Sequence, residues 1–487
     1  MSERYYGLIS IKARVNTYGV FFLAFFFLAG CRHGLPRMDR PHHGRPGGGA
    51  VSAGDELPKE VRRRLTSIIK VKGVRMDRRE EKLQDLSERF HALLDRLSNR
   101  LPGDQLAARA RKKLISGDFE GAGSDLLVSI EKNEKKISVT RRPAAADAFD
   151  LGLLYALRLE HKDARDYFLR AVGLEAKNSD YLHELGVMSD LLGSSTKAVE
   201  YYNKALEVDL AAFGNKHANI SRSYHHLGLS WDRLGDMNKA VRYYNKALEV
   251  DLVVFGEKHA KIAVSYDNLG RAWNVLGDKD KALGYYKKAL ESDLAVFGET
   301  HPKTAARYNK LGLAWGSVGD MKQAIGYYEK ALAVHLALFG ENHLRLASGY
   351  NTLGSAWYAF GNMKKAIQYY EKTLNILSGA FGENHPNVIP TYNNLGAAWD
   401  ASGNMKQAIR YYTKVQKVFI SIFGEKHPNV GISSNNLGEV WRKSGDSKKA
   451  AESYKKALAI FQAAFGPNHP NTKTVQSNLR KLAPFNP

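Results

Sequence analysis

The sequence predicts an all-α fold, a right-handed solenoid of antiparallel helix pairs that follows an amphipathic helical segment. Three periodic features predict it: one tryptophan per unit, a Leu-Gly pair in constant phase with it, and a Phe-Gly pair that closes each unit. Chains that repeat in this way are built from small units that bury their apolar faces against their neighbours. The tryptophans recur every 42 residues, at Trp231, Trp273, Trp315, Trp357, Trp399 and Trp441.

Each unit has the pattern of two helices joined by a tight turn. Leu269, Gly270 and Trp273 fall on one face of a first helix, and the glycine leaves room for a close neighbour. Gly277 ends that helix and Asp278 caps the second one, which continues for about 19 residues until the closing Phe-Gly. A proline near the start of several first helices suits a first helical turn.

These positions resemble the tetratricopeptide repeat, in which small and large residues alternate as Leu-Gly, Trp, Ala, Tyr and Ala do here. The unit length and the closing Phe-Gly-Glu-Lys-His-Pro resemble the kinesin light chain variety of that repeat. The resemblance covers residues 103–487. It implies a scaffold that binds proteins and has no enzymatic activity.

The repeat pattern divides the chain into five segments. We expect a signal peptide at 1–30, a lipidated cysteine with a disordered tether at 31–56, and a helical stalk or amino-terminal cap at 57–102. About nine helix pairs follow at 103–472, and a capping helix with a short tail at 473–487.

The stalk carries an apolar stripe at helical spacing. The stripe is too short for a confident coiled coil. We therefore expect its helix to pack on the first repeat, with dimerisation as the alternative. Its members are Leu83, Leu86, Phe90, Leu93 and Leu97.

The amino terminus has the pattern of a bacterial lipoprotein leader. A basic segment precedes a ten-residue apolar run at 20–29, which is too short to span a bilayer. The sequence Leu-Ala-Gly-Cys that ends at Cys31 resembles the lipobox, and this resemblance implies acylation of the only cysteine in the chain. Arg32, where many retained lipoproteins have Asp, favours the outer membrane, facing the periplasm. The alternative is an uncleaved anchor with an incidental cysteine.

More than half of the net charge of +22 lies ahead of the regular 42-residue units. Residues 1–142 hold 29 basic and 17 acidic side chains, more than half of the excess. Such a surface suits anionic lipids, acidic proteins or nucleic acid, or it is simply solvated.

No arrangement of residues in the sequence supports catalysis. The chain has no glycine-rich phosphate loop, no nucleophile elbow and no metal-spaced Cys/His set. Seven histidines recur once per unit, so they cannot converge on one metal ion, and we expect each to hydrogen-bond a helix end. We therefore expect no enzyme, no cofactor, no metal site and no small-molecule substrate. These histidines are His217, His259, His301, His343, His385, His427 and His469.

A candidate peptide groove follows from the residues opposite the buried face of each first helix. These positions lie one residue before, two after and six after the Leu of each Leu-Gly pair, and the one-before position is occupied by Glu184, His226, Asn268, Lys310, Thr352, Asn394 and Asn436. Asparagine is a poor residue in the middle of a helix, so its recurrence there indicates another role. In kinesin light chain repeats an Asn-Asn-Leu sequence lines the concave groove and holds extended peptides, which is what the resemblance implies here. The candidate groove residues are Asn268, Arg271, Asn309, Lys310, Asn351, Asn393, Asn394, Asn435 and Asn436.

The sequence therefore predicts a membrane-anchored scaffold that binds an extended protein segment in this groove. Small residues beyond the asparagines leave room for the segment, and Arg271 and Lys310 would favour an acidic residue at one of its ends. One alternative is a structural assembly factor of a cell-envelope complex that uses its outer surface. A second is a binder of anionic polymer or nucleic acid, which a processed signal peptide would argue against.

Overall fold

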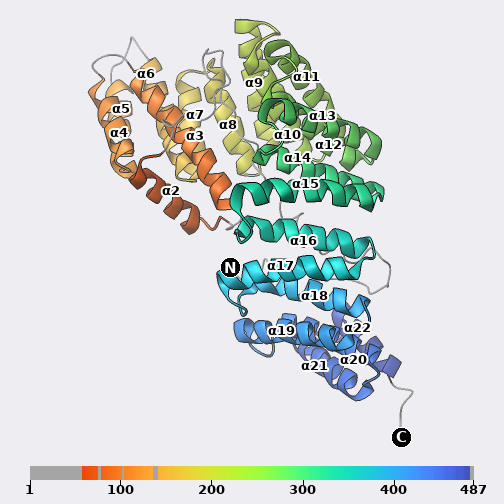
Figure 1. Ribbon diagram of the computed structural model, residues 1–487. Helices are drawn as coiled ribbons and strands as arrows, with labels where there is room; N and C mark the ends of the chain where they lie inside the picture. Colours follow the sequence, from red (N-terminus) through yellow and green to blue (C-terminus); the bar gives the residue numbers. More distant parts are fainter. Residues whose placement is uncertain (1–56, 75–77, 101–103, 135–140, 483–487) are drawn as a thin grey trace. The chain divides into compact units, whose positions relative to one another are not determined.

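The computed structural model describes residues 57–74, 78–100, 104–134 and 141–482, and all regular structure in these ranges is helical (Figure 1). The expected all-α fold is therefore confirmed. The predicted signal peptide, Cys31 and the tether lie outside the described residues. Among the helices of the described ranges, none combines the length and the apolar character needed to cross a membrane.

The contacts between residues divide the chain into two units, and each is described by itself. The amino-terminal unit lies within residues 35–296, and only the last residue of its final helix, Phe297, is assigned to the other unit. It contains α2 (Lys59–Val71), α3 (Arg79–Ser98), α4 (Gln105–Ile115), α5 (Phe119–Glu134), α6 (Arg141–Leu157), α7 (His161–Leu174), α8 (Ser179–Leu191), α9 (Ser195–Phe213), α10 (Ala218–Arg233), α11 (Met237–Phe255), α12 (Ala260–Leu276) and α13 (Lys279–Phe297).

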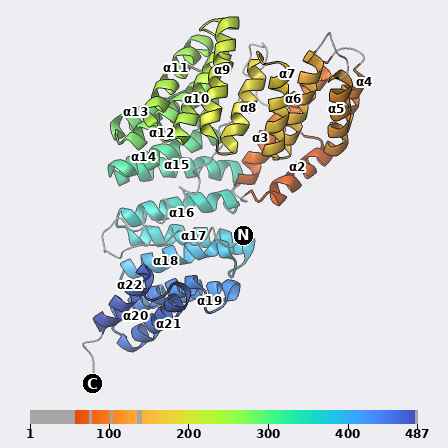
Figure 2. The same cartoon turned by 180° about the vertical axis from the view of Figure 1, so that it is seen from behind.

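The carboxy-terminal unit lies within residues 297–487. Consecutive helices in it run antiparallel and pack in chain order, as both views of the ribbon show (Figures 1 and 2). It contains α14 (Pro302–Val318), α15 (Met321–Phe339), α16 (Leu344–Ala359), α17 (Met363–Phe381), the 3₁₀ helix η2 (Pro386–Val388), α18 (Ile389–Ala401), α19 (Met405–Phe423), α20 (Pro428–Lys443), α21 (Ser447–Phe465) and α22 (Pro470–Leu482).

Each helix pair from α6 and α7 to α20 and α21 is held together by a close contact between a glycine and an aromatic ring. In the pair α16 and α17, a Cβ atom on Gly354 would lie 2.6 Å from the ring of Tyr370, which is fully buried. The same contact joins Gly270 to Tyr286 in α12 and α13, where the Cβ would lie 2.9 Å from the ring. A side chain at the glycine would push the two helices apart, so the Leu-Gly signature is a packing requirement, as the sequence predicts.

Polar side chains and glycines set the ends of these helices. Asp278 Oδ1 accepts a hydrogen bond of 3.1 Å from the backbone N–H of Lys281, which confirms the expected cap. Gly277 ends α12 with φ of 88°, a left-handed conformation that favours glycine. Pro390 has no N–H to donate to the carbonyl of Pro386, and the chain ahead of α18 accordingly forms a 3₁₀ turn.

The stalk consists of two helices, α2 and α3, and not of one long helix. The stripe residues Leu86, Phe90, Leu93 and Leu97 are buried, and α3 packs against α4 and α6. This confirms the expectation that the stalk helix packs on the first repeat. Because the stripe is covered within one chain, it is not available for dimerisation.

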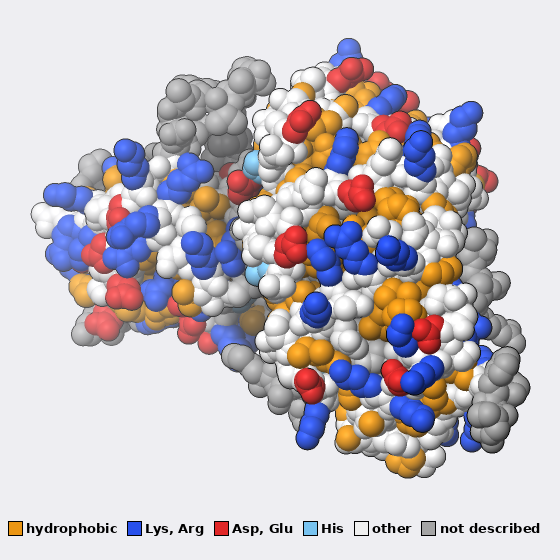
Figure 3. Space-filling view, turned by 60° about the horizontal axis from the view of Figure 1, so that its bottom comes forward, with side chains coloured by type: hydrophobic (Ala, Val, Ile, Leu, Met, Phe, Trp, Pro, Cys, Tyr) orange, Lys and Arg blue, Asp and Glu red, His pale blue; other side chains and the backbone are white. Residues whose placement is uncertain are grey.

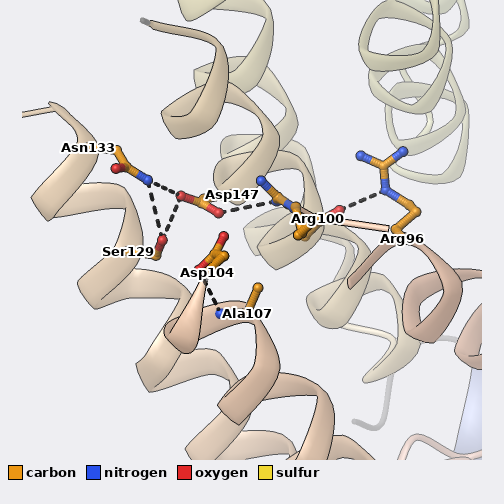
Figure 4. Close-up of polar contacts among 8 residues, drawn as sticks. Arg96, Arg100, Asp104, Ala107, Ser129, Asn133 and Asp147 are labelled. Carbon is orange, nitrogen blue, oxygen red and sulfur yellow. Dashed lines mark hydrogen bonds and ion pairs between the residues drawn. The ribbon is translucent and has the colours of Figure 1, made fainter. Parts of the chain in front are cut away.

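A buried ionic network joins α3 to α6, as Figure 4 shows. Arg96 Nε donates to Asp150 Oδ1 at 2.7 Å, and Arg100 pairs with both Asp150 and Asp147. Ser129 Oγ donates to the Asp147 carboxylate at 2.8 Å. Burial raises the pKa of Asp147, and the opposing charge of Arg100 limits this increase. Both carboxylates are fully buried and paired, so they fix the position of α3 on the repeats.

We predict opposite effects for two glycine substitutions in the carboxy-terminal unit. Gly354→Ala should destabilise it by about 1–3 kcal/mol, because the added methyl group overlaps the Tyr370 ring. Gly326→Ala, within α15, meets nothing within 4 Å and should stabilise it by about 0.5–1 kcal/mol. Chemical denaturation of the two variants checks this, and equal effects would contradict the role assigned to Gly354.

Candidate peptide-binding face

Four positions in each first helix are counted from the Leu of the Leu-Gly pair: two residues before it, one before it, two after it and six after it. We call the surface formed by these positions the first-helix face. In the carboxy-terminal unit the first helices α16 and α18 lie in contact with one another. Hydrogen bonds join this face from one repeat to the next. Asn394 Nδ2 donates to Asn351 Oδ1 at 2.9 Å, and Asn478 Nδ2 donates to Asn435 Oδ1 at 3.1 Å. The recurrent asparagines therefore have a structural role between repeats.

The series of asparagine bonds is interrupted between α18 and α20. Asn393 and Asn436 occupy the positions equivalent to Asn351 and Asn394, but no hydrogen bond joins either side chain to another described residue. Both side chains are partly exposed. Each amide can offer one acceptor and two donors to a ligand.

In the amino-terminal unit the expected exposure of this face is wrong. Asn268 is only 9% exposed, and its Nδ2 lies 3.4 Å from Nε2 of His225 in the preceding repeat. Glu184 and His226, at the same repeat position, are also buried. The reason is that neighbouring first helices lie side by side, so a residue one before the Leu faces the preceding helix and not the solvent.

Histidines form the interior of this face in the first repeats. The ring centroids of His183 and His226 lie 4.5 Å apart, and Tyr202 packs 5.2 Å from His226. Burial lowers the pKa of His226 well below its ordinary value of 6.5, and the positive charges of Arg222 and Arg233 act in the same direction. His226 is therefore neutral at pH 7.

Arg271 does not present an unpaired charge, in contrast to the expectation from the sequence. It forms an ion pair with Asp232 of the preceding repeat and donates a hydrogen bond of 3.2 Å to the hydroxyl of Tyr244. Burial alone would lower its pKa, but the bonds to Asp232 and the charge of Tyr244 raise it overall. Attraction of an acidic ligand residue by Arg271 is correspondingly weak. Lys310 is exposed.

The small residues of the face lie beside the asparagines, as expected. Ala397 and Ala359 are partly exposed, and Ala401 is exposed. Ser355 Oγ, on α16, accepts a hydrogen bond of 3.1 Å from the hydroxyl of Tyr370, whose side chain extends from α17 between the two helices. The face near Asn393 is therefore formed by small side chains.

The recurrent histidines cap the starts of helices. In each unit Nδ1 accepts a bond of 3.1–3.2 Å from the backbone N–H two residues ahead. Each ring also stacks on the Phe of the closing Phe-Gly pair, with centroids 4.1–4.8 Å apart. Within the described residues no cluster of three or more His, Cys, Asp or Glu side chains could hold a metal ion.

Sequence reasoning missed the polar pairs between repeats, although the sequence contains a signal for them. Partners separated by 43 residues, one more than the repeat length, include Asn351 with Asn394, and Asp400 with Lys443 at 2.6 Å. Arg233 and Asp190 follow the same rule at 2.7 Å. Complementary polar residues at that spacing would have indicated the pairing of neighbouring first helices.

A tetratricopeptide repeat family model matches residues 180–251, 232–295, 274–335, 316–378, 349–419 and 400–463, which together make up more than half of the chain. The chain belongs to the tetratricopeptide repeat family. Proteins of this family generally act as non-enzymatic scaffolds that bind other proteins, and the fold of this chain is that of a protein-interaction scaffold.

Several solved structures are similar to this chain. BtubC (BKLC) from P. vanneervenii is 24% identical over 48% of this chain and 91% of its own, with a TM-score of 0.40. The nearly identical, kinesin light chain-type TPR-like repeats of a Podosopora anserina protein are 19% identical over 43% and 99%, with a TM-score of 0.39. The apo quorum sensor NprR from B. thuringiensis is 17% identical over 74% and 97%, with a TM-score of 0.46. The comparison with curated proteins gave no match.

We predict that acid destabilises the amino-terminal unit through His226. The unfolded chain takes up a proton near pH 6.5 but the folded chain does not, so stability should fall as the pH drops below about 6.5. The loss from this group is at most about 1.4 kcal/mol per pH unit. Thermal unfolding of wild type and His226→Gln between about pH 7 and pH 5 checks this. A variant with the same pH dependence as wild type would contradict it.

Proposed function

We propose that this chain is a lipid-anchored scaffold of the bacterial cell envelope that binds an extended protein segment across the first-helix face of α16, α18 and α20. The observation that carries the proposal is the interrupted asparagine series. Asn393 and Asn436 lie on neighbouring repeats, are partly exposed and make no hydrogen bond to another described residue. Two amides so placed can each bond the backbone of an extended segment.

The surroundings of these two asparagines suit a main-chain ligand. Ala397 and Ala401 are small and leave room for side chains of the bound segment, while Asn351 and Asn394 are held by each other. A fixed neighbouring pair lowers the cost of ordering the site when the ligand binds. This arrangement favours hydrogen bonds to the main chain of the bound segment over contacts that depend on its side chains.

The second alternative from the sequence, a binder of anionic polymer, has less support on this face. Lys443 is paired with Asp400, and Arg442 is paired with Glu439. In the space-filling view of Figure 3, Lys and Arg side chains are interspersed with apolar, uncharged and acidic ones. A continuous basic track is the feature that nucleic-acid binding requires.

Removal of the two uncommitted asparagines should weaken binding without loss of stability. We expect the variant with Asn393→Ala and Asn436→Ala to capture at least about tenfold less partner from envelope extract, because each lost ligand bond costs about 1 kcal/mol. Asn375→Ala, at an exposed position of α17, is the matched control. Unchanged capture by the double variant would favour the assembly-factor alternative, in which the outer surface makes the contacts.

Asn394→Ala separates the two roles of asparagine. It should lower stability by about 1 kcal/mol, because the variant loses the bond to Asn351 Oδ1 and leaves that oxygen unpaired. Its thermal midpoint is therefore expected to fall more than that of the double variant.

Membrane attachment is proposed to depend on Cys31. We expect Cys31→Ser to leave the precursor unprocessed or to release the protein from the membrane fraction, because acylation needs the thiol. Fractionation and mass measurement of the two proteins check this. Normal processing and membrane recovery of the variant would rule out the lipid.

A further inference from the structure

The first described helix, α2, has a strongly basic outer face. Six basic side chains and one acidic side chain lie between Lys59 and Lys72. The acidic one, Glu60, is bonded to Arg63 at 2.7 Å and to Arg64 at 3.3 Å, so it offsets part of their charge. Lys59, Arg62 and Lys70 are exposed.

These basic residues lie together on one side of the helix. A shallow, open depression is lined by four cationic side chains and two hydroxyl side chains, and no carboxylate lines it. Helical spacing places them one turn after another along the same side. Its lining residues are Lys59, Arg62, Arg63, Thr66, Ser67 and Lys70.

The packing of the opposite side of α2 keeps this basic face exposed to solvent. Val61, Leu65 and Ile69 are buried in the core of the amino-terminal unit. The turn between α4 and α5 also lies against α2, because a Cβ atom on Gly117 would come within 2.9 Å of Glu60 Cγ. α2 therefore cannot rotate to cover its basic side chains.

We propose that this basic face of α2 binds the anionic headgroups of a phospholipid membrane. Cationic side chains near an anionic bilayer are attracted to it. The hydroxyl of Ser67 can donate to a lipid phosphate, whereas Thr66 Oγ1 already donates to the backbone carbonyl of Arg62 at 2.8 Å. Val71, at the end of the helix, is 80% exposed and can enter the apolar edge of the headgroup layer.

A lipid surface fits this face better than nucleic acid does. α2 contains no aromatic residue on which a base could stack, and its basic side chains lie on the outside of one helix and not along a groove. The face begins 28 residues after Cys31, within reach of the same bilayer. The inference thus deepens the proposed membrane attachment, but the binding of α2 to headgroups does not require the acyl chain.

The test uses the chain from residue 32 onward, which has no acyl chain and contains every residue that the structure describes. Its binding to phosphatidylcholine vesicles with and without phosphatidylglycerol is measured by sedimentation at low and high salt. We expect binding only to the anionic vesicles, weakened by salt. The variant with Lys59→Glu, Arg62→Glu and Lys70→Glu should bind at least about tenfold more weakly.

A matched control reverses three exposed charges elsewhere. The variant with Lys448→Glu, Lys455→Glu and Lys456→Glu on α21 changes the net charge by the same amount and should bind within about twofold of wild type. Equal losses in the two variants would overturn the proposal, since they would indicate a general effect of net charge. Unchanged vesicle binding by the α2 variant, with loss of binding to a DNA oligonucleotide, would assign the face to nucleic acid instead. Failure of the Cys31→Ser prediction would leave this result unaffected, so the two proposals fail separately.

Discussion

The contact between a glycine of the first helix and an aromatic ring of the second is the interaction on which the helix pairs from α6 to α21 depend. It brings two backbones so close that no side chain fits at the glycine, and the ring fills the space that remains. Gly228 with Tyr244 and Gly438 with Tyr454 repeat the geometry, and Gly152 with Phe168 extends it to a repeat of another length. Because the ring reaches through the pair, its hydroxyl emerges near the first-helix face, where Tyr370 bonds Ser355 and Tyr244 bonds Arg271.

The contact within a pair explains why polar side chains must join neighbouring pairs. First helices of successive repeats lie side by side, and the first-helix face that they form is in part exposed to solvent. The residues that lie between these helices at the solvent-exposed edge therefore cannot all be apolar. Pairs of asparagine side chains suit these positions, because each amide carries both hydrogen-bond donors and an acceptor. The two amides of a pair occupy similar surroundings on neighbouring repeats. Asn351 with Asn394 is one such pair, and His225 with Asn268 is a variant of it. An asparagine in this position is thus a structural residue first.

The fold could be predicted from the sequence almost completely, because the features that determine it are local and repeated. Gly270 and Asp278 have the roles that their spacing indicates, and the histidine caps follow from one residue per unit at a helix start. The binding face could be predicted only in part. Exposure on a helix depends on what lies beside it, and a helical wheel for one repeat does not contain the neighbouring repeat. This is why Asn268 was expected at the surface and is buried, and why the pairing of Arg271 with Asp232 was missed.

The hydrogen bonds between asparagines of neighbouring repeats also indicate where on the carboxy-terminal unit the binding site lies. If asparagine at these positions served only to join repeats, each neighbouring pair of asparagines would be hydrogen-bonded. The bonds from Asn394 to Asn351 and from Asn478 to Asn435 fulfil that requirement, whereas no hydrogen bond joins Asn393 to Asn436. An asparagine in the middle of a helix lowers the stability of that helix. Where its amide forms no hydrogen bond to the neighbouring repeat, no interaction within the chain offsets this loss. A ligand that bonds both amides would supply the missing partners. The position of this gap, between α18 and α20, is therefore where we place the centre of the binding face.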